Sequence, residues 1–489
     1  MLRRIAITSI APLFPDAVYG GSQAVLSRIA IGLAEAGAEV DLICSARPEN
    51  SGGFELAPGV RVRPLLRLTG AFPDPYEVPP ADLAATARDI APLLKAAELV
   101  YLHADIFHFR DLIPATTPVV RSFHDFHYET ALVSAFAHSA DLTIVPSRYV
   151  ADCIRATVGA SGLREMEPVR VIPNGIDTDL FTPDGPSDIE GLPSRVQGDP
   201  DDLVLLYPHR PDERKGIFEA LTVLSRLDAS GAGRRIRLVV PRHLDAGNLP
   251  FMADQYAEID ARARQMGLSH IVEYVPWVSQ EQMPNFYRYG DVTLCLGNII
   301  EAFGLTPYES IACGTPAVVV NVGGYRGLPD LPGLRRIDYG DHQSAVAAIR
   351  ELAEEPARSA APPALSARFT AGFTESRMVN SYVEALLGDP PAPRSRAQPP
   401  RPNSAPDIPA NPDTRPDDRL MLAPWCYAES AAIYDDYAYG RRQLPSLAEF
   451  FRNNDAAGVY TEREFADAAV PADEMAEAMS QNVLIQQYA

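Results

Sequence analysis

Lysine is almost absent from this chain of 489 residues. Of the 43 Lys and Arg residues only Lys95 and Lys215 are lysines, which leaves 43 − 2 = 41 arginines. Such a composition indicates that arginine occupies most positions where either cation serves. Lys215 is therefore a candidate for a role that needs a compact ammonium on a flexible stem rather than a planar guanidinium.

An excess of basic charge is also missing. The formal net charge is −21, and Asp plus Glu outnumber Lys plus Arg in each of the regions 1–185, 186–388 and 389–489. This balance argues against nucleic acid as a partner, because its phosphates require a basic face. An anionic membrane surface would repel the first region for the same reason.

Long apolar runs and paired cysteines are missing as well. No run reaches the ~18 apolar residues of a membrane span, and Pro12 and Pro15 interrupt the apolar segment after Met1, which is better interpreted as a first strand than as a signal peptide. The five cysteines form no C-x2-C pair. We therefore expect a cytoplasmic protein with reduced thiols, no stable membrane insertion and no cysteine-based metal site.

What the chain does contain is a repeated alternation of strand-like and helix-like segments. The first series of strands is expected at 5–9, 39–44, 99–103, 119–123 and 142–145, and the second at 203–207, 237–240, 271–274, 292–296 and 317–320. Amphipathic segments separate them, including 22–36, 81–96, 216–227, 252–266, 280–289 and 345–354. This α/β pattern predicts two doubly wound Rossmann-like domains that face a cleft, with ligands at the carboxyl ends of the strands.

A pair of carboxylates eight positions apart stands out in the second series. Glu301 and Glu309 flank Gly304, where the strand 292–296 is followed by a helix expected to begin near Phe303. A helix start offers unpaired N–H groups to an anion such as a diphosphate, and a glycine lets that anion come close. Glu301 can accept hydrogen bonds from sugar hydroxyls, while Glu309 can chelate a ribose diol.

This segment resembles the E-x7-E motif of the family-4 glycosyltransferases, retaining enzymes of the GT-B fold. The resemblance covers about residues 1–388, and further segments of the family pattern occur in the same order: Gly20-Gly21-Ser22-Gln23, Ser122-Phe123-His124-Asp125, Val145-Pro146-Ser147, Ile172-Pro173-Asn174-Gly175-Ile176-Asp177, and Arg210 with Lys215-Gly216.

The resemblance implies a set of catalytic residues. Arg210 and Lys215 would stabilise the leaving diphosphate, Glu301 would orient the sugar, and His124 would hydrogen-bond to it. The neighbouring Asp125 and His127 leave the assignment of His124 open, and Asp125 is placed on the acceptor side.

Other residues are assigned by the same resemblance to binding. Gly21, Phe303, Gly304, Leu305, Thr306 and Glu309 would contact the donor, and Gly20 the acceptor. Pro276 and Trp277 would contact the donor's base, with Trp277 either stacking on that base or filling the core. His209 replaces the glycine that usually precedes the Arg in this family, which puts the loop geometry in doubt.

The expected reaction is transfer of a sugar from a nucleoside-diphosphate sugar to a hydroxyl or amine of a soluble small-molecule or glycan acceptor, with retention at the anomeric carbon. No cofactor and no catalytic metal is expected, because Asp177 and Asp179 mimic a D-x-D metal site but lie in the family's interdomain segment. A GT-B nucleotide-sugar epimerase and a catalytically silent binding or scaffold protein remain as alternatives.

The predicted domains are 1–185, for the acceptor, and 186–373, for the nucleotide sugar, with a helix at 374–388 that crosses back to the first. Acceptor contacts are expected from loops around 53–80 and 107–114. Residues 389–418 contain ten prolines in thirty positions, which predicts an extended linker. The tail 419–489 is expected to be a small, mostly helical appendage that packs on its own chain or on a second subunit of a homo-oligomer, or that covers the acceptor site.

Overall fold

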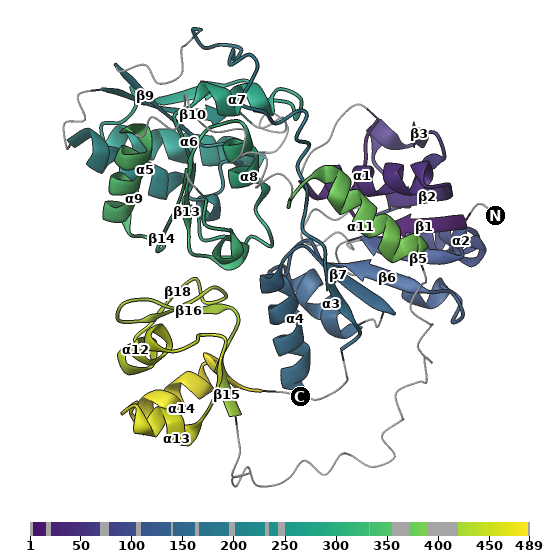
Figure 1. Ribbon diagram of the computed structural model, residues 1–489. Coiled ribbons are helices and arrows are strands. Elements are labelled where there is room, and N and C mark those ends of the chain that lie inside the picture. The colour runs from purple at the N-terminus through teal and green to yellow at the C-terminus, as the bar shows by residue number, and fades with distance from the viewer. Residues whose placement is uncertain are drawn as a thin grey trace. The chain divides into compact units, whose positions relative to one another are not determined.

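The computed structural model describes residues 3–15, 21–68, 78–103, 109–137, 140–161, 166–194, 201–229, 234–242, 250–331, 333–354, 372–388 and 419–487. Gly20 and the predicted linker 389–418 lie outside the described residues. The chain forms two compact units, Met1–Ile172 with Val379–Ala489, and Pro173–Met378. It therefore leaves the first unit once and later returns to it. Figure 1 labels the elements of both units.

The first unit contains an eight-stranded sheet in the order β3-β4-β2-β1-β5-β6-β7-β8. Only β3 is antiparallel to its neighbour, and the core of the sheet consists of fully buried aliphatic runs such as Ile5–Ile7. The strands are β1 (Arg3–Thr8), β2 (Ala38–Ser45), β3 (Phe54–Ala57), β4 (Val60–Leu66), β5 (Leu99–His103), β6 (Val119–Ser122), β7 (Leu142–Val145) and β8 (Val169–Val171).

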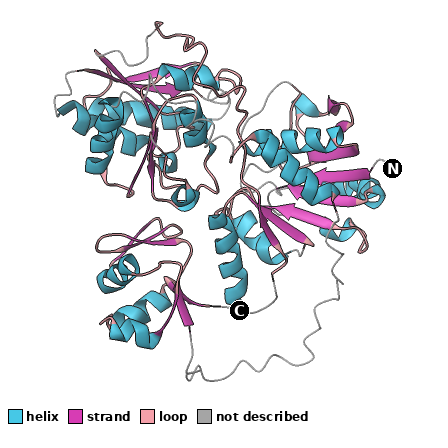
Figure 2. Cartoon of the chain, in the orientation of Figure 1, coloured by secondary structure: helices cyan, strands magenta, loops and turns pink. Residues whose placement is uncertain are grey.

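Helices flank these strands (Figure 2). They are α1 (Gly21–Glu35), α2 (Pro80–Ala96), α3 (Glu129–Ala137), α4 (Arg148–Ser161) and α11 (Glu375–Leu387). The end of α11 is held on the first unit, where Arg3 donates to the carbonyl oxygens of Leu386 and Leu387 at 3.2 and 3.1 Å. Gly32 of α1 permits this packing, because a Cβ there would lie 2.1 Å from a methyl of Val379.

All five strands predicted for this unit are present, whereas β3, β4 and β8 were not predicted. The β3–β4 hairpin lies in the first part of the segment 53–80, which was expected to form an acceptor loop. At the start of β4, Val60 to Arg63 alternate between apolar and charged residues as in a half-buried strand, but Pro64 then interrupts this short pattern. Pairing with β2 supplies the stabilisation that this local pattern lacks.

The second unit contains a six-stranded parallel sheet in the order β11-β10-β9-β12-β13-β14. Its strands are β9 (Asp202–Leu206), β10 (Arg235–Pro241), β11 (Val272–Val275), β12 (Val292–Cys295), β13 (Ala317–Val320) and β14 (Leu334–Ile337). Its helices are α5 (Ile217–Ala229), α6 (Pro250–Gln265), α7 (Met283–Tyr289), α8 (Leu305–Ala312) and α9 (His342–Glu354). The strand order reverses between β9 and β12, and in open sheets of this kind ligands bind beyond the carboxyl ends at such a point.

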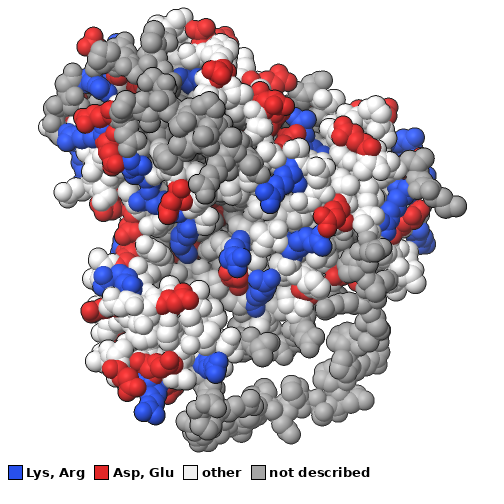
Figure 3. All heavy atoms as spheres, viewed as in Figure 1, with Lys and Arg blue, Asp and Glu red and all other residues white. Residues whose placement is uncertain are grey.

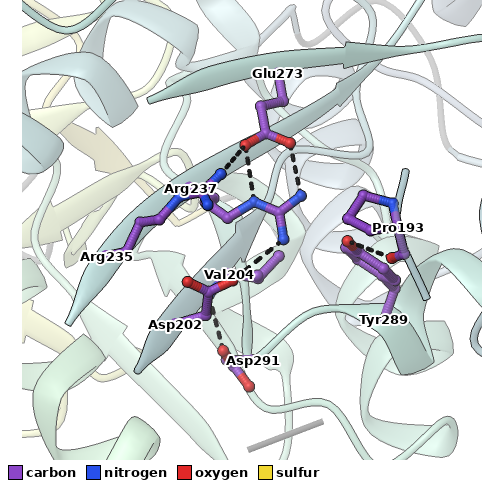
Figure 4. Close-up of polar contacts among 8 residues, drawn as sticks. All are labelled: Pro193, Asp202, Val204, Arg235, Arg237, Glu273, Tyr289 and Asp291. Atoms are coloured by element: carbon purple, nitrogen blue, oxygen red, sulfur yellow. Dashed lines mark hydrogen bonds and ion pairs between the residues drawn. The ribbon is translucent and has the colours of Figure 1, made fainter. Parts of the chain in front are cut away.

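The amino ends of these strands are tied together by an ion-pair cluster (Figure 4). The buried guanidinium of Arg237 donates to both carboxylate oxygens of Glu273, at 2.8 and 2.6 Å, and lies 3.4 Å from Asp202. The hydrogen bonds from Arg237 lower the pKa of Glu273. Asp291 accepts from the N–H of Val204 at 2.8 Å. This end of the sheet is thus occupied by structural contacts, which leaves the carboxyl ends for a ligand.

The division between the units falls between Ile172 and Pro173 rather than at the predicted 185/186. Ile176 forms a β-bridge with Thr374, and a Cβ at Gly175 would lie 2.3 Å from the carbonyl oxygen of Thr374. These backbone contacts fasten the segment to the second unit. The sequence pattern could not show them, because the partner lies about 200 residues away.

The described part of the C-terminal region, 419–487, folds around its own apolar core. It contains the predicted helices, α12 (Pro445–Asn453), α13 (Glu462–Asp467) and α14 (Ala472–Ser480), and also six short strands: β15 (Arg419–Leu422), β16 (Cys426–Ala428), β17 (Ile433–Asp435), β18 (Gly440–Arg442), β19 (Val459–Thr461) and β20 (Leu484–Gln486). They form two antiparallel sheets, β19-β15-β20 and β16-β17-β18. Strands of three or four residues are too short to show a period of two, which is why the sequence suggested mainly helices.

Charged residues of both signs are interspersed over the face seen in Figure 3, and the basic ones form no large patch there. The five cysteines are buried free thiols, and burial raises the pKa of Cys44 to about 11. Among the described helices, none combines the length and apolar character that a bilayer crossing requires.

Candidate active site

The predicted cation Lys215 and the predicted carboxylate Glu301 lie together at the point where the second sheet reverses its strand order. Lys215 ends a 3₁₀ turn, Glu213–Lys215, in the segment after β9, and Glu301 lies in the segment after β12. Lys215 Nζ is 2.5 Å from Glu301 Oε1, and each side chain is 19% exposed. Because the pair is only partly shielded from water, both charged groups remain accessible to a ligand.

Two glycines allow these segments to come so close. Gly216 has φ of +90°, and a Cβ on it would lie 2.3 Å from the backbone nitrogen of Gly297. A Cβ on Gly297 would lie 2.2 Å from the carbonyl oxygen of Arg214. Larger residues at either position would push the segments apart and separate Lys215 from Glu301.

His209, the departure from the family pattern, lies beside this pair. Burial, and to a smaller extent the charge of Lys215, lower its pKa to about 3, while Glu301 acts in the opposite direction. The imidazole is therefore neutral near pH 7, and it packs edge-on against Tyr207 with ring centroids 5.2 Å apart. Sequence comparison flagged this position only as a missing glycine, so its place next to the pair was not predicted.

Arg210, the other predicted cation, is exposed. Its carbonyl oxygen accepts a hydrogen bond from the hydroxyl of Tyr207 at 3.2 Å and from the N–H of Asp212 at 2.7 Å, which fixes the backbone of the turn. Within the described ranges its guanidinium forms no ion pair. Arg214 is also exposed, and its guanidinium lies 3.9 Å from the carboxylate of Asp212.

The helix start in the E-x7-E segment is built on Gly304. This residue is the N-cap of α8 with φ of +77°, and a Cβ on it would lie 2.1 Å from the ring of Tyr325. The helix begins at Leu305, two residues later than predicted. Because the first N–H groups of a helix have no partner within it, Leu305 and Thr306 are placed to bind an anion.

Phe303 has a different environment from the one predicted. Its side chain is 7% exposed and stacks on Tyr308, with ring centroids 4.7 Å apart and an interplanar angle of 7°. Its ring therefore belongs to the core of the unit, and any contact with a ligand would come from its backbone.

Glu309 lies on α8 and is half-buried. One carboxylate oxygen accepts a hydrogen bond from the hydroxyl of Tyr287 at 2.8 Å. Burial raises its pKa to about 7, although the bond from Tyr287 acts in the opposite direction. The carboxyl group thus titrates near neutrality, a property that depends on burial in the fold and has no signal in the local sequence.

Gly323 and Gly324, which follow β13, were not among the residues predicted for the site. A Cβ on Gly323 or Gly324 would lie 2.8 or 2.7 Å from the carbonyl oxygen of Glu301, and the N–H of Gly324 donates to that oxygen at 2.6 Å. The doublet therefore fixes the backbone that carries the first carboxylate. Its position directly after a buried strand was the available signal.

In the first unit, His124 follows β6 and is 7% exposed. Neither ring nitrogen has a hydrogen-bond partner among the described residues, and burial lowers its pKa to about 4. Its ring lies against that of His103, with centroids 4.3 Å apart. A buried neutral imidazole with two unused nitrogens can hydrogen-bond a ligand, since leaving them unpaired is costly.

His103, at the end of β5, was not predicted but supports His124. Its Nδ1 is 3.0 Å from the hydroxyl of Tyr101, and its Nε2 is 3.1 Å from both the hydroxyl and the carbonyl oxygen of Ser22. Ser22 follows Gly21, which opens α1 and is exposed. The network thus connects the predicted Gly21 segment to His124, and Asp125 lies half-buried next to His124.

Pro276 and Trp277 lie after β11 and line a hollow of the second unit together with Asp188, Ile189, Glu190, Val278, Gln282 and Asn285. Pro276 is exposed and Trp277 is half-buried, so Trp277 does not belong to the core.

Asp177, part of the apparent D-x-D metal site, accepts hydrogen bonds from the N–H groups of Asp179 and Leu180 at 3.0 and 3.2 Å. Its carboxylate shapes a local turn.

Two regions of the chain match the sequence models of known protein families. Residues 19–180 match Glycosyltransferase Family 4, and residues 190–362 match Glycosyl transferases group 1. The D-inositol 3-phosphate glycosyltransferase of Actinosynnema mirum is 27% identical over 421 residues, which cover 78% of this chain and 97% of the relative.

The chain belongs to the family-4 glycosyltransferases of the GT-B fold. The D-inositol 3-phosphate glycosyltransferase of Xylanimonas cellulosilytica is 28% identical over 52% of this family member, and the match spans 59% of that relative, less than two thirds of its length. The structure of Anabaena HepE in complex with UDP-glucose matches with a TM-score of 0.59 and 19% identity, over 78% of this chain and 98% of that one. The predicted two-domain α/β fold is thereby confirmed.

Proposed function

We propose that this protein transfers a sugar from a nucleoside-diphosphate sugar to a hydroxyl or amine of a small-molecule or glycan acceptor, with retention of the anomeric configuration and without a catalytic metal. The observation that carries the proposal is the contact between Lys215 and Glu301 beside the Gly304 helix start, at the reversal of the second sheet. A cation, a carboxylate and a row of N–H groups are the chemical groups that a sugar diphosphate requires.

Cleavage of the bond between sugar and diphosphate places positive charge on the ring and negative charge on the leaving phosphate. Lys215, Arg210 and the N–H groups of Gly304, Leu305 and Thr306 would stabilise that phosphate, which is expected to be the largest contribution to the rate. When the donor binds, the ammonium of Lys215 exchanges its bond to Glu301 for one to the diphosphate, and Glu301 turns to the sugar hydroxyls.

The remaining residues bind and orient the donor. Glu309 would hydrogen-bond the ribose, and Pro276 and Trp277 would contact the base. His124 would donate to or accept from the transferring sugar through a nitrogen that has no partner among the described residues. No protein group is needed to remove the acceptor proton, because the departing phosphate oxygen lies on the same face of the sugar and can take it.

The relatives and the structural neighbour support the substrate class. The structure of Anabaena HepE contains UDP-glucose, and the two relatives bear the name D-inositol 3-phosphate glycosyltransferase. The acidic composition of the chain favours a soluble acceptor over one embedded in an anionic membrane. Neither epimerisation nor a purely structural role has an observation of its own in its favour.

The test is to incubate the full-length chain with a panel of nucleoside-diphosphate sugars and polyol, amine and glycan acceptors, with and without EDTA. We expect a glycoside product whose anomeric NMR coupling matches that of the donor, formed equally in EDTA. An inverted product, a loss of activity in EDTA, or conversion of donor to an isomer without acceptor would each contradict the proposal.

A further inference from the structure

The C-terminal region 419–487 lies beyond both regions that match the family. It belongs to the same compact unit as Met1–Ile172, and three contacts between described residues connect it to that part of the chain. The hydroxyl of Tyr149, on α4, donates to Asp436 at 2.7 Å, Ala156 of α4 packs against the apolar core of the region, and the hydroxyl of Tyr437 donates to the carbonyl oxygen of Phe126. Packing on its own chain was one of the arrangements expected for this region, beside packing on a second subunit and covering the acceptor site.

Two of the three contacts come from the loop of the β17–β18 hairpin, Asp436–Tyr439, and this loop is held in one shape. The carboxylate of Asp435 accepts from the N–H groups of Tyr437 and Ala438 at 3.0 and 3.1 Å. Arg442 lies 3.3 Å from the other oxygen of Asp435. Tyr439 has φ of +51°, a conformation that a residue with a side chain adopts only when its surroundings require it.

The ring of Tyr437 is also held. It meets the ring of Trp425 edge-on, with centroids 5.9 Å apart and an interplanar angle of 89°. The N–H of Asp436 donates to the carbonyl oxygen of Trp425 at 3.0 Å. Because both the backbone and the ring of Tyr437 are held, its hydroxyl has one fixed position. A group with a fixed position can orient another segment.

The hydroxyl of Tyr437 reaches the segment 123–128, which carries the predicted site residues His124 and Asp125. This segment lies between β6 and α3 and belongs to neither. Phe126 is 2% exposed and packs edge-on against Phe123 at 5.8 Å. The hydroxyl of Tyr437 supplies the carbonyl of Phe126 with a hydrogen-bond donor from outside the segment.

We propose that Tyr437 is a positioning residue for the reaction: by holding the carbonyl of Phe126 it fixes the backbone on which His124 is presented. The proposal rests on the proposed function, since it assigns His124 to the transferring sugar. His124 needs such support because neither of its ring nitrogens is anchored by a hydrogen bond to the residues that the structure describes, although its ring packs against that of His103. The C-terminal region thereby acts on the reaction without touching the substrate.

The test compares three variants of the full-length chain in the transfer assay. Tyr437→Phe removes the hydroxyl and keeps the ring. Tyr460→Phe is the matched control, because its hydroxyl donates to the carbonyl of Asp455 at 2.7 Å within the C-terminal region. Tyr149→Phe removes an attachment on α4 without touching the segment 123–128.

For Tyr437→Phe we expect kcat to fall about tenfold with the donor KM changed less than about twofold, since small errors in placement reduce turnover strongly. Tyr460→Phe should match the wild type, and Tyr149→Phe should lose less than Tyr437→Phe. Equal kcat for Tyr437→Phe and Tyr460→Phe would overturn the proposal, as would an equal loss in Tyr149→Phe, which would indicate general loosening.

Hydrogen exchange of the peptide that contains residues 123–128 provides a readout without substrate. Exchange there should increase in Tyr437→Phe and remain unchanged in Tyr460→Phe, and unchanged exchange in both would refute the positioning role. Absence of transfer by the wild type would refute the proposed function alone. If Tyr437→Phe does not fold, Trp425→Phe replaces it, because this change loosens the contact on the Tyr437 ring. We expect a smaller loss of kcat in Trp425→Phe, and a wild-type kcat in that variant would refute the proposal.

Discussion

Lys215 is the residue on which the proposed chemistry depends most, because it is the only lysine beside the carboxylate pair and is paired with Glu301 at 2.5 Å. Replacing it by alanine removes the ammonium that would meet the leaving phosphate. We expect Lys215→Ala to lower kcat at least about 100-fold, the order seen when a preorganised donor to a developing charge is deleted.

The chain offers a matched control, since Lys95 is exposed in the last turn of α2. Lys95→Ala should retain full turnover. Steady-state kinetics and far-UV circular dichroism on both variants check the prediction. Near-normal kcat in Lys215→Ala, with the fold preserved, would contradict the role given to this residue.

Glu309 makes stability depend on pH. Its folded-state pKa is about 7, raised from 4.5, so folding favours the protonated form. Its contribution to the free energy of unfolding is fully present below pH 4.5 and is lost as the pH rises through 7. The difference between a pKa of 4.5 and one of about 7 limits this contribution to at most about 3.4 kcal/mol, and contact with solvent reduces it.

Urea denaturation of the wild type and Glu309→Gln between pH 4.5 and 8 measures this contribution. The wild type should lose stability relative to Glu309→Gln over that interval, because glutamine keeps the hydrogen bond from Tyr287 without titrating. A difference between the two proteins that stays constant with pH would show that Glu309 titrates in its usual range.

At the scale of elements, the start of α8 depends on the absence of a side chain at Gly304. Alanine there would be strained at φ +77° and would also place its Cβ 2.1 Å from the ring of Tyr325. We expect Gly304→Ala to destabilise the protein by about 2–4 kcal/mol and to weaken donor binding, because both the backbone conformation and the packing are disturbed.

Gly267 separates the two effects. It has a similar φ of +73°, and a Cβ there meets nothing within 4 Å. Gly267→Ala should therefore cost only about 1 kcal/mol and leave donor binding unchanged. Equal losses in the two variants, measured by chemical denaturation and donor titration, would show that the contact with Tyr325 is unimportant.

The elements also show why sequence and structure agreed in part. The strands whose residues are buried on both faces, such as β1 and β12, were predicted from their continuous apolar runs. The strands that were missed are β3, β4 and β8 in the first unit, β14 in the second and β15–β20 at the C-terminal end, and they are short or interrupted by polar residues. Their stability comes from pairing with neighbours, which a local pattern does not record.

For the whole molecule, the division into two units with separate sheets predicts more than one unfolding transition. Since Lys215, Glu301 and Gly304 all lie within Pro173–Met378, nucleotide binding should stabilise that unit. We expect UDP at about 100 times its Kd to raise one calorimetric transition by roughly 5 °C or more.

Gly304→Ala should lower the midpoint of the same transition. In Lys215→Ala, UDP should fail to raise that midpoint. The other transition should keep its midpoint. If the nucleotide shifted only the transition of the unit that contains His124, the assignment of the donor site to Pro173–Met378 would be contradicted.

The sequence by itself determined the alternation of strands and helices, the two doubly wound domains and the order of the family motifs, because these are encoded in local periodicity and in short segments. It also identified Lys215 and Glu301 as separate candidates. It could not reveal that they meet across 86 residues, that His103 supports His124, or that Tyr437 reaches Phe126 across 311 residues.

Those pairings were decided by the tertiary structure alone. The order of the strands determines which loops become neighbours, and glycines such as Gly216 and Gly297 let their backbones come into contact. Burial within the folded units then sets the pKa values of His209, His124 and Glu309. Both effects arise only when distant segments remove one another from water, and neighbours along the chain cannot supply them.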